Sequence, residues 1–241
     1  MRSPFKKTKR FIFFVCIIIL AIAAYFVDDG YKLYKKVINE VSLEEKVKDI
    51  KNDDEYTDIE DISGYLKDSI ISIEDRRFYE HFGIDLYSIG RALVGNFKKK
   101  EFASGGSTIT QQLAKNMYFS QEKNITRKIA EVFVALDLEE NYSKDEILEL
   151  YLNIIYFGDG YYGVKEATNG YFSKEPSELT LYESTLIAGI PNAPSVYALS
   201  NKSKLTYERQ IMVINALLDT EKISKEEYNE ILKEVKNVEN E

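Results

Sequence analysis

The sequence contains few of the residues that interrupt helices or cross-link a small domain. There are only 4 prolines, one histidine, one cysteine and no tryptophan among 241 residues. Scarce proline favours helices. The single cysteine, Cys16, excludes an intrachain disulfide and a cysteine-based metal site. A positive overall charge is also lacking, because the formal net charge is -8. Neutralising phosphates requires a basic surface, so this charge argues against a general nucleic-acid binder.

What the chain does contain is typical of a folded protein. Hydrophobic residues make up 44% and charged residues 30% of the composition, a balance seen in globular rather than disordered chains. The 241 residues have room for one good-sized domain and an appendage, but not for two full enzymatic domains. We therefore expect one active site.

A basic segment followed by an apolar run occupies the N-terminus. Residues 11–27 carry no charge, and the run ends at Asp28 and Asp29. At about 1.5 Å per residue, this run is close to the shortest helix that crosses a bilayer core. The basic flank predicts that residues 1–10 stay in the cytoplasm and that the catalytic domain is extracellular, attached to the cell membrane by a single pass. The flank consists of Arg2, Lys6, Lys7, Lys9 and Arg10.

A cleaved signal peptide is the alternative interpretation of this segment. The stretch from Ala21 to Ala24 resembles an A-x-A cleavage site. The apolar run exceeds the usual signal core of about 7–15 residues, which favours a retained anchor. Both interpretations export the domain.

Beyond the anchor, the sequence divides into three parts. Residues 28–60 are charged and predict a stalk, residues 61–219 predict the domain, and residues 220–241 predict a charged C-terminal helix. Segment 147–155 is apolar nearly all round, so we expect it at the centre of the fold. No alternating strand pattern rivals the helical ones, and the prediction is a mainly α domain. Capping-box patterns that open helices begin at Ser42, Ser143, Thr180 and Ser224.

Three blocks hold residues that could carry chemistry. In the first, Ser72 to Asp85, Glu74 and Asp75 precede two arginines and the only histidine, and by itself Glu74 has the properties of a solvated surface carboxylate. The second, Ser104 to Asn116, has a glycine pair that allows close backbone approach, and Ser107 is a good helix N-cap.

The second and third blocks also contain charged residues at helical spacing. Amides and hydroxyls at a helix N-terminus predict an anion site, with Thr108, Gln112 and Lys115 on one face of the following helix. A polar loop with a capped helix is the plain alternative. In the third block, Arg127 and Glu131 are i,i+4 neighbours. As an exposed pair they would contribute only about 0.3–0.5 kcal/mol.

Taken together, five segments resemble the motifs of the peptidoglycan glycosyltransferases, glycosyltransferase family 51, in order and spacing. The segments are EDRRFYEHFGID, GGSTITQQLAKN, RKIAE, KDEILELYLN and GYYGVKEATNGYFSK, within residues 70–198. Five motifs in the right order are far less probable by chance than any one alone. Thr168 and Asn169 depart from the small residues that the family tends to have in the last motif, which puts only local packing in doubt.

The resemblance implies a lysozyme-like helical fold with an N-terminal transmembrane helix. It also implies an enzyme that polymerises lipid II, an undecaprenyl-diphosphate-linked disaccharide pentapeptide, into glycan strands during cell-wall biosynthesis. By this match Glu74 is the general base and Glu131 the second acidic residue. Lys115 and Arg127 would hold the donor diphosphate. The cleft would be lined by Ser107, Thr108 and Gln112.

The residue types suit this chemistry. A sugar hydroxyl that attacks an anomeric carbon needs a base, which a carboxylate can supply. The departing diphosphate is already a good leaving group, so cations can replace the strong general acid of a glycosidase. Two roles are open to Glu131: it could orient Arg127, or it could ligate a divalent cation, Mg²⁺ or Mn²⁺, that bridges the diphosphate.

A lipid-linked substrate predicts further membrane contact. Apolar residues between the first two blocks lie close to helical spacing and precede three lysines, a pattern that suits a surface dipping into the membrane. An ordinary amphipathic core helix is the alternative. The residues are Leu86, Ile89, Leu93, Phe97, Lys98, Lys99 and Lys100. Partners expected from all these features are lipid II, the growing strand, the cytoplasmic membrane and other cell-wall synthesis proteins.

Three other functions compete with this one. A penicillin-binding transpeptidase would need S-x-x-K, S-x-N and K-T-G signatures, but only isolated S-x-x-K matches occur, at Ser3 and Ser120, without K-T-G. We therefore expect a monofunctional glycosyltransferase. A lysozyme-like lytic enzyme would protonate its leaving group with a carboxylic acid, and the cationic pair of Lys115 and Arg127 speaks against it. An inactive scaffold of cell-wall assembly is the third alternative, against which the intact Glu74 and Glu131 speak.

Overall fold

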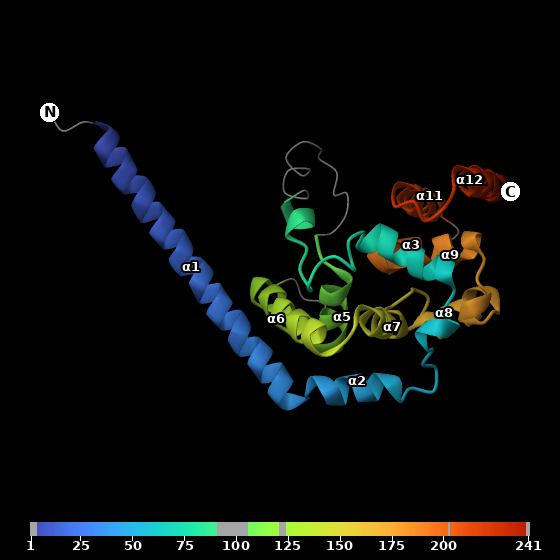
Figure 1. Cartoon of the computed structure of the whole chain (residues 1–241), viewed down its shortest axis with the longest axis horizontal. Helices are drawn as coiled ribbons and strands as arrows, with labels where there is room; N and C mark the ends of the chain where they lie inside the picture. Colours follow the sequence, from blue (N-terminus) through green and yellow to red (C-terminus); the bar gives the residue numbers. More distant parts are fainter. Residues whose placement is uncertain (1–3, 91–105, 121–123, 202, 240–241) are drawn as a thin grey trace.

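The computed structural model describes residues 4–90, 106–120, 124–201 and 203–239 (Figure 1). Within these ranges the chain is built from helices, and its only β-type pairings are two isolated bridges. The mainly α class predicted from the sequence is confirmed. The helices that bear on the site are α1 (Pro4–Glu40), α2 (Leu43–Lys51), α3 (Gly64–Glu74), α5 (Ile109–Tyr118), α6 (Ile125–Asn141), α7 (Lys144–Ile154), α8 (Val164–Phe172), α9 (Leu181–Gly189), α11 (Lys204–Asp219) and α12 (Lys225–Glu239).

Local capping explains where several of these helices begin. Ser143 caps α7 and Thr180 caps α9. In each case the side chain of the glutamate three residues later accepts a hydrogen bond from the backbone N–H of the cap residue. Ser42 accepts from the Glu45 amide at the start of α2. A side-chain cap of this kind stabilises a helix by about 1 kcal/mol. These helix starts are confirmed as the sequence predicts them.

Helix α7 lies at the centre of the molecule, as its apolar pattern predicts. Ile147, Leu150, Tyr151 and Leu152 are completely buried. The one carboxylate on its inner surface, Glu149, accepts bonds from the backbone and side chains of the segment that follows α2. Buried polar groups need such partners, and these bonds join the N-terminal segment to the core.

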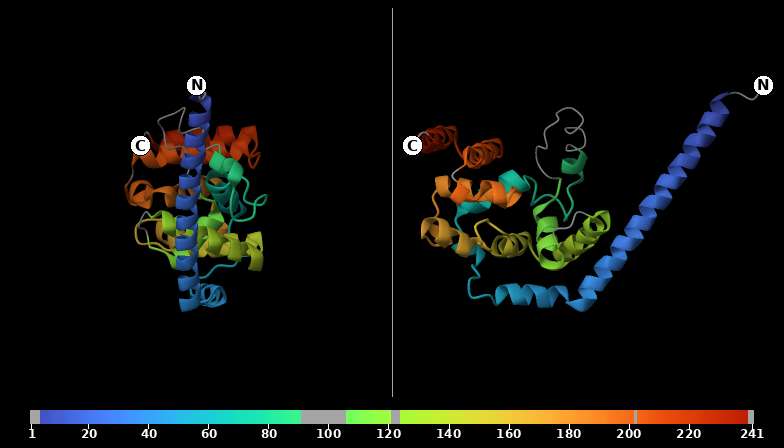
Figure 2. Two further views of the ribbon diagram at one scale, coloured as in Figure 1. Left: turned by 90° about the vertical axis from the view of Figure 1, so that its left-hand side faces the viewer. Right: turned by 180° about the vertical axis from the view of Figure 1, so that it is seen from behind.

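Helix α1 runs along one side of the domain and extends far beyond it (Figures 1 and 2). Its apolar part is exposed, with Phe11 at 70% and Leu20 at 67% of full exposure. In the described part of the chain, this is the one helix long and apolar enough to cross a membrane. The part of α1 that follows the apolar segment packs against α6.

The segment predicted to be a stalk, 28–60, is therefore not detached from the domain. Tyr34 and Val47 from this segment are buried in the main hydrophobic core. The physical reason is that aromatic and aliphatic residues spaced between its charges form an apolar stripe, which the charge density of the segment hides. The predicted C-terminal helix likewise has an apolar side, and α12 buries Ile231 and Val235 against α11.

Part of the predicted membrane-contacting helix lies within the described residues. Leu86 is 77% exposed, and its neighbour Tyr87 is 64% exposed. Their exposure agrees with a surface that contacts something other than the core. Leu93, Phe97 and Lys98 to Lys100 lie outside the described residues.

Candidate active site

Glu74 is the last residue of α3, and its carboxylate is held on both sides. The side chain is only 9% exposed. Gln112 Nε2, on α5, donates to Glu74 Oε2 at 2.8 Å, and Arg209 Nη2, on α11, donates to Oε1 at 3.1 Å. A surface carboxylate would have no such enclosure. Glu74 is therefore a positioned group rather than a solvated one.

The neighbouring carboxylate of Asp75 serves the fold. It is 6% exposed and lies 2.9 Å from His81 Nε2. The amide of Ile109, at the start of α5, donates to Asp75 Oδ2 at 3.0 Å. Asp75 thus connects the end of α3 with the beginning of α5. This connection places Gln112, one turn into α5, beside Glu74.

A second carboxylate, Glu131 on α6, is completely buried between two cations. Arg127 Nη1 contacts Glu131 Oε1, and Lys128 Nζ lies 2.9 Å from Oε2. Lys128 Nζ also donates to Ser107 Oγ at 2.7 Å. The predicted Arg127–Glu131 pair is present, but it is buried, so the small contribution of an exposed pair does not apply to it.

Two donors near Glu131 have no acceptor among the residues that the structure describes. Lys115, on α5, forms no ion pair or hydrogen bond with any residue that the structure describes. Burial lowers the pKa of Lys115, and the charges of Arg127 and Lys128 lower it further, against the opposing effect of Glu131. Arg127 Nε is buried and likewise lacks a partner among the described residues. Three cations against one carboxylate leave a positive excess, which an anionic group would neutralise.

The sequence model of the Transglycosylase family matches residues 40–218. The chain belongs to the transglycosylase family. Penicillin-binding protein 1A of Neisseria flavescens is 43% identical over 180 residues, which are 75% of this chain and 23% of that protein. Penicillin-binding protein 1F of Bacillus subtilis is 40% identical over 239 residues, which are 92% of this chain and 33% of that protein.

The chain thus spans about a quarter to a third of the length of these curated relatives. Among solved structures, the crystal structure of penicillin-binding protein 1A from Haemophilus influenzae aligns with a TM-score of 0.41 and 28% identity, covering 74% of this chain and 17% of that one. The family match includes every residue that the sequence assigns to the site.

One of the residues that the sequence assigns to the cleft, Thr108, has a structural role. Thr108, and not Ser107, is the N-cap of α5, and it forms a reciprocal capping box with Gln111. Its hydroxyl donates to the Gly83 carbonyl at 2.7 Å, and the residue is 3% exposed. Gly83 has φ +74°, which a residue with a Cβ rarely adopts. The helix begins one residue later than predicted because threonine caps almost as well as serine and the box needs Gln at its third position.

Three residues that contact the candidate site residues were not predicted from the sequence. The first, Lys128, binds Glu131. The second, Tyr151, belongs to the apolar segment 147–155, and its hydroxyl donates to Gln112 Oε1 at 3.3 Å. Burial raises the pKa of Tyr151 far above its usual range, which keeps this hydroxyl a donor. The third, Arg209, lies beyond the motif range. The only indication in the sequence that Arg209 is not a surface residue is its position among the apolar residues of segment 204–219.

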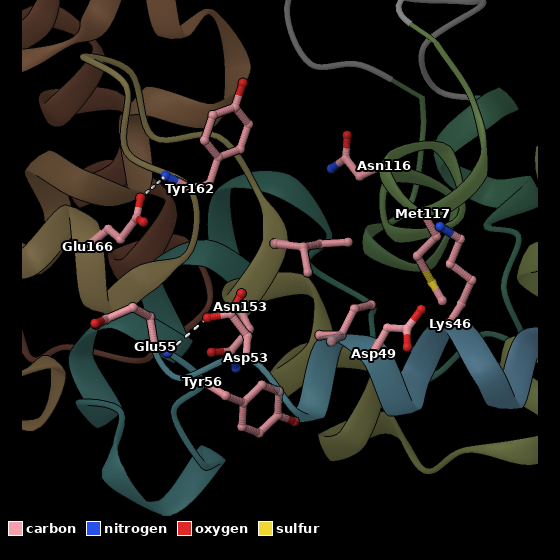
Figure 3. A pocket seen from close by; sticks show the side chains of 12 residues that line it. Lys46, Asp49, Asp53, Glu55, Tyr56, Asn116, Met117, Asn153, Tyr162 and Glu166 are labelled. Atoms are coloured by element: carbon pink, nitrogen blue, oxygen red, sulfur yellow. Dashed lines mark hydrogen bonds between the residues drawn. The ribbon is translucent and has the colours of Figure 1, made fainter.

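A cavity of about 380 Å³ lies between α2, α5, α7 and α8 (Figure 3). Asn116 and Met117 of α5 face it, as do Asn153 and Tyr162. Neither Glu74 nor Lys115 lines it. Asn116 follows Gln112 by one helical turn, so the cavity lies close to the candidate site but does not include Glu74 or Lys115.

The described residues around Glu131 do not fit a divalent-metal site. Both oxygens of Glu131 are taken by cationic side chains. Within the described ranges, no group of three or more His, Cys, Asp and Glu residues could hold a metal ion. A divalent cation prefers several oxygen ligands, and the donor set around Glu131 consists of ammonium and guanidinium groups. Of its two open roles, the orientation of Arg127 agrees better with this arrangement.

Proposed function

We propose that the chain is a peptidoglycan glycosyltransferase that polymerises lipid II into glycan strands and releases undecaprenyl diphosphate. The observation that carries the proposal is one enclosed carboxylate, Glu74, close to a cluster of cations whose donors at Lys115 and Arg127 lack acceptors among the described residues. A base next to a cluster of cations is what transfer from a glycosyl diphosphate needs. Membership of the transglycosylase family supports the same reaction.

Glu74 would act as the base. The 4-hydroxyl of the acceptor sugar attacks the anomeric carbon of the donor, and the carboxylate takes the hydroxyl proton as the new C–O bond forms. Gln112 and Arg209 hold the two oxygens of Glu74 in a fixed orientation before the acceptor arrives. Fixed geometry of this kind lowers the entropic part of the barrier.

The cations would act on the leaving group. As the bond to the anomeric carbon breaks, its electron pair goes to the diphosphate, whose growing charge Lys115, Arg127 and Lys128 stabilise. Burial lowers the pKa of Lys115 because it destabilises the charged ammonium group. A bound anion would offset this destabilisation. Glu131 holds Arg127 and Lys128 in place. No step here depends on the Mg²⁺ or Mn²⁺ that the sequence leaves open.

The membrane arrangement is part of the proposal. The exposed apolar segment of α1 would cross the cytoplasmic membrane once, with the domain outside the cell, where the positive N-terminal flank predicts it. In intact cells, added protease should then remove a tag placed at Glu241. A protected tag would contradict this topology. Contacts with other cell-wall synthesis proteins stay a prediction.

Purified protein mixed with fluorescent lipid II tests the function. A ladder of glycan polymers that disappears in Glu74→Gln supports the proposal. Shortening of preformed glycan, with no ladder from lipid II, would instead assign the site to a lytic enzyme. A lytic enzyme needs a carboxylic acid to protonate its leaving group, and the cation cluster argues against that alternative.

A further inference from the structure

A row of paired side chains joins α1 to α6, and we call it the α1–α6 seam. Asp29 Oδ2 accepts from Thr126 Oγ1 at 2.8 Å. Further along both helices, the Tyr34 hydroxyl donates to Asp137 Oδ2 at 2.6 Å. The ring of Phe133 lies 5.2 Å from that of Tyr31 and 5.6 Å from that of Tyr34. The seam consists of Asp29, Gly30, Tyr31 and Tyr34 on α1, and of Thr126, Ile129, Phe133 and Asp137 on α6.

The seam is tightly packed at the end that lies nearer the apolar segment of α1. A Cβ added to Gly30 would lie 2.5 Å from Ile129 Cγ2 and 3.2 Å from the Thr126 carbonyl oxygen. Only glycine lets the two helices approach so closely. Helix α1 continues without interruption from Pro4 to Glu40, so the exposed apolar segment and the seam belong to one rigid rod (Figure 2).

The seam meets α6 where the diphosphate-binding residues begin. Thr126, which binds Asp29, immediately precedes Arg127, and Ile129 lies between Arg127 and Glu131. The apolar run of α1 ends at Val27. Asp29 therefore lies about 3 Å further along the helix axis, because each residue adds about 1.5 Å. The polar layer on each side of a bilayer core is about 5–8 Å thick. This spacing places the start of α6 inside the layer that holds lipid headgroups.

We propose that the α1–α6 seam is a positioning element that holds the cations of α6 at the level of the membrane headgroups. The seam then selects a substrate whose diphosphate lies in the same membrane. This inference rests on the proposed function and adds to it. The residues of the seam touch no substrate. They act through Arg127 and Lys128, whose height above the apolar core of the membrane they set.

An insertion that changes only this height tests the proposal. Seven polar helix-forming residues placed between Val27 and Asp28 lengthen α1 by about 10.5 Å. They rotate the seam by only about 20° relative to the apolar segment, because seven residues nearly complete two turns. The α1–α6 contacts can therefore form as before. The matched control carries the same seven residues between Lys9 and Arg10, where they leave the distance from the membrane to α6 unchanged.

Polymerisation is then measured with lipid II in vesicles and with a water-soluble, short-chain lipid II analogue. In vesicles, the rigid insertion should lower the rate at least about tenfold, because misplacing reacting groups by an ångström can cost about 100-fold. On the soluble analogue, it should match the wild-type chain and the control. A flexible insertion of seven glycines and serines at the same place should regain part of the vesicle activity, because the domain can return to the surface.

Equal vesicle rates for the rigid insertion and the wild-type chain would overturn the positioning role. Loss on the soluble analogue in the rigid and the flexible variants, but not in the control, would also overturn it, because α1 would then act on the fold of α6 rather than on its level. Failure of the wild-type chain to polymerise either substrate would instead reject the proposed function itself.

Discussion

Arg209 and Glu74 are 135 positions apart in the sequence, and Arg209 Nη2 lies 3.1 Å from Glu74 Oε1. The arginine is 11% exposed on its side chain and is also held by the Gly189 carbonyl, to which Nε donates at 3.3 Å. A guanidinium fixed at two points holds the carboxylate better than a flexible ammonium could. Arg209 therefore positions the carboxylate that we propose as the base.

The first prediction concerns this pair. Arg209→Lys should retain the charge but lose the fixed fork, so the rate of polymerisation should fall at least about tenfold while apparent substrate affinity changes little. Steady-state rates with lipid II measure both quantities. Arg76→Lys is the matched control, because Arg76 pairs with Asp219 at the surface, where it is 38% exposed. An equal loss in both variants would contradict a specific role for Arg209.

The second prediction separates the two adjacent carboxylates. Glu74→Gln keeps the size of the side chain but removes its basicity, so turnover should fall at least about 100-fold while lipid II still binds. Its melting temperature should also fall, because the mostly buried Arg209 loses its charged partner, so turnover is measured at a temperature at which the variant stays folded. Asp75→Asn should act chiefly on the melting temperature, because Asp75 accepts bonds from both His81 and the Ile109 amide. Near-normal turnover in Glu74→Gln would reject the assignment of the base.

The third prediction follows from the lowered pKa of Lys115. Its ordinary value is 10.5, and folding lowers it, chiefly through burial. Between the lowered value and 10.5 the unfolded chain binds more protons than the folded chain, so the contribution of Lys115 to the free energy of unfolding increases as pH rises. Lys115→Met should remove this alkaline increase and should also abolish polymerisation. Denaturant unfolding between pH 8 and 10 measures the slope, and an unchanged slope would contradict the prediction.

The fourth prediction contrasts Arg127 with Lys115. Arg127→Ala leaves Glu131, which is completely buried, with Lys128 as its remaining partner. Breaking a buried pair on one side costs about 3–5 kcal/mol, so this variant should unfold at clearly lower denaturant concentration. Lys115→Met should not, because Lys115 has no such partner in the described chain. Arg127→Ala combined with Glu131→Gln should recover part of the lost stability but none of the activity.

The fifth prediction concerns metal. Because both oxygens of Glu131 are bound by cationic side chains, removing divalent cations with EDTA should change the rate of polymerisation by less than about twofold. A large loss that Mg²⁺ or Mn²⁺ restores, and that Glu131→Gln makes insensitive to the added ion, would show that Glu131 is a metal ligand after all.

Signals that span about one helical turn were readable in the sequence. The capping boxes at Ser143 and Thr180, the all-round apolar pattern of segment 147–155 and the i,i+4 spacing of Arg127 and Glu131 all depend on neighbours within four residues. Such local relations follow from helix geometry alone. The family motifs added the identity of the candidate site residues, and the helical class followed from the periodicity.

The remaining features depend on segments that meet only in the folded chain. Nothing within one turn of Arg209 indicates Glu74, nothing near Lys128 indicates Ser107, and the charges around Tyr34 hide its burial against α6. Whether Glu131 is an exposed or a buried carboxylate was likewise decided by packing, not by spacing. Each of these contacts forms because helix packing has already overcome the entropy of closing a long loop, and that outcome belongs to the whole chain rather than to any local pattern in it.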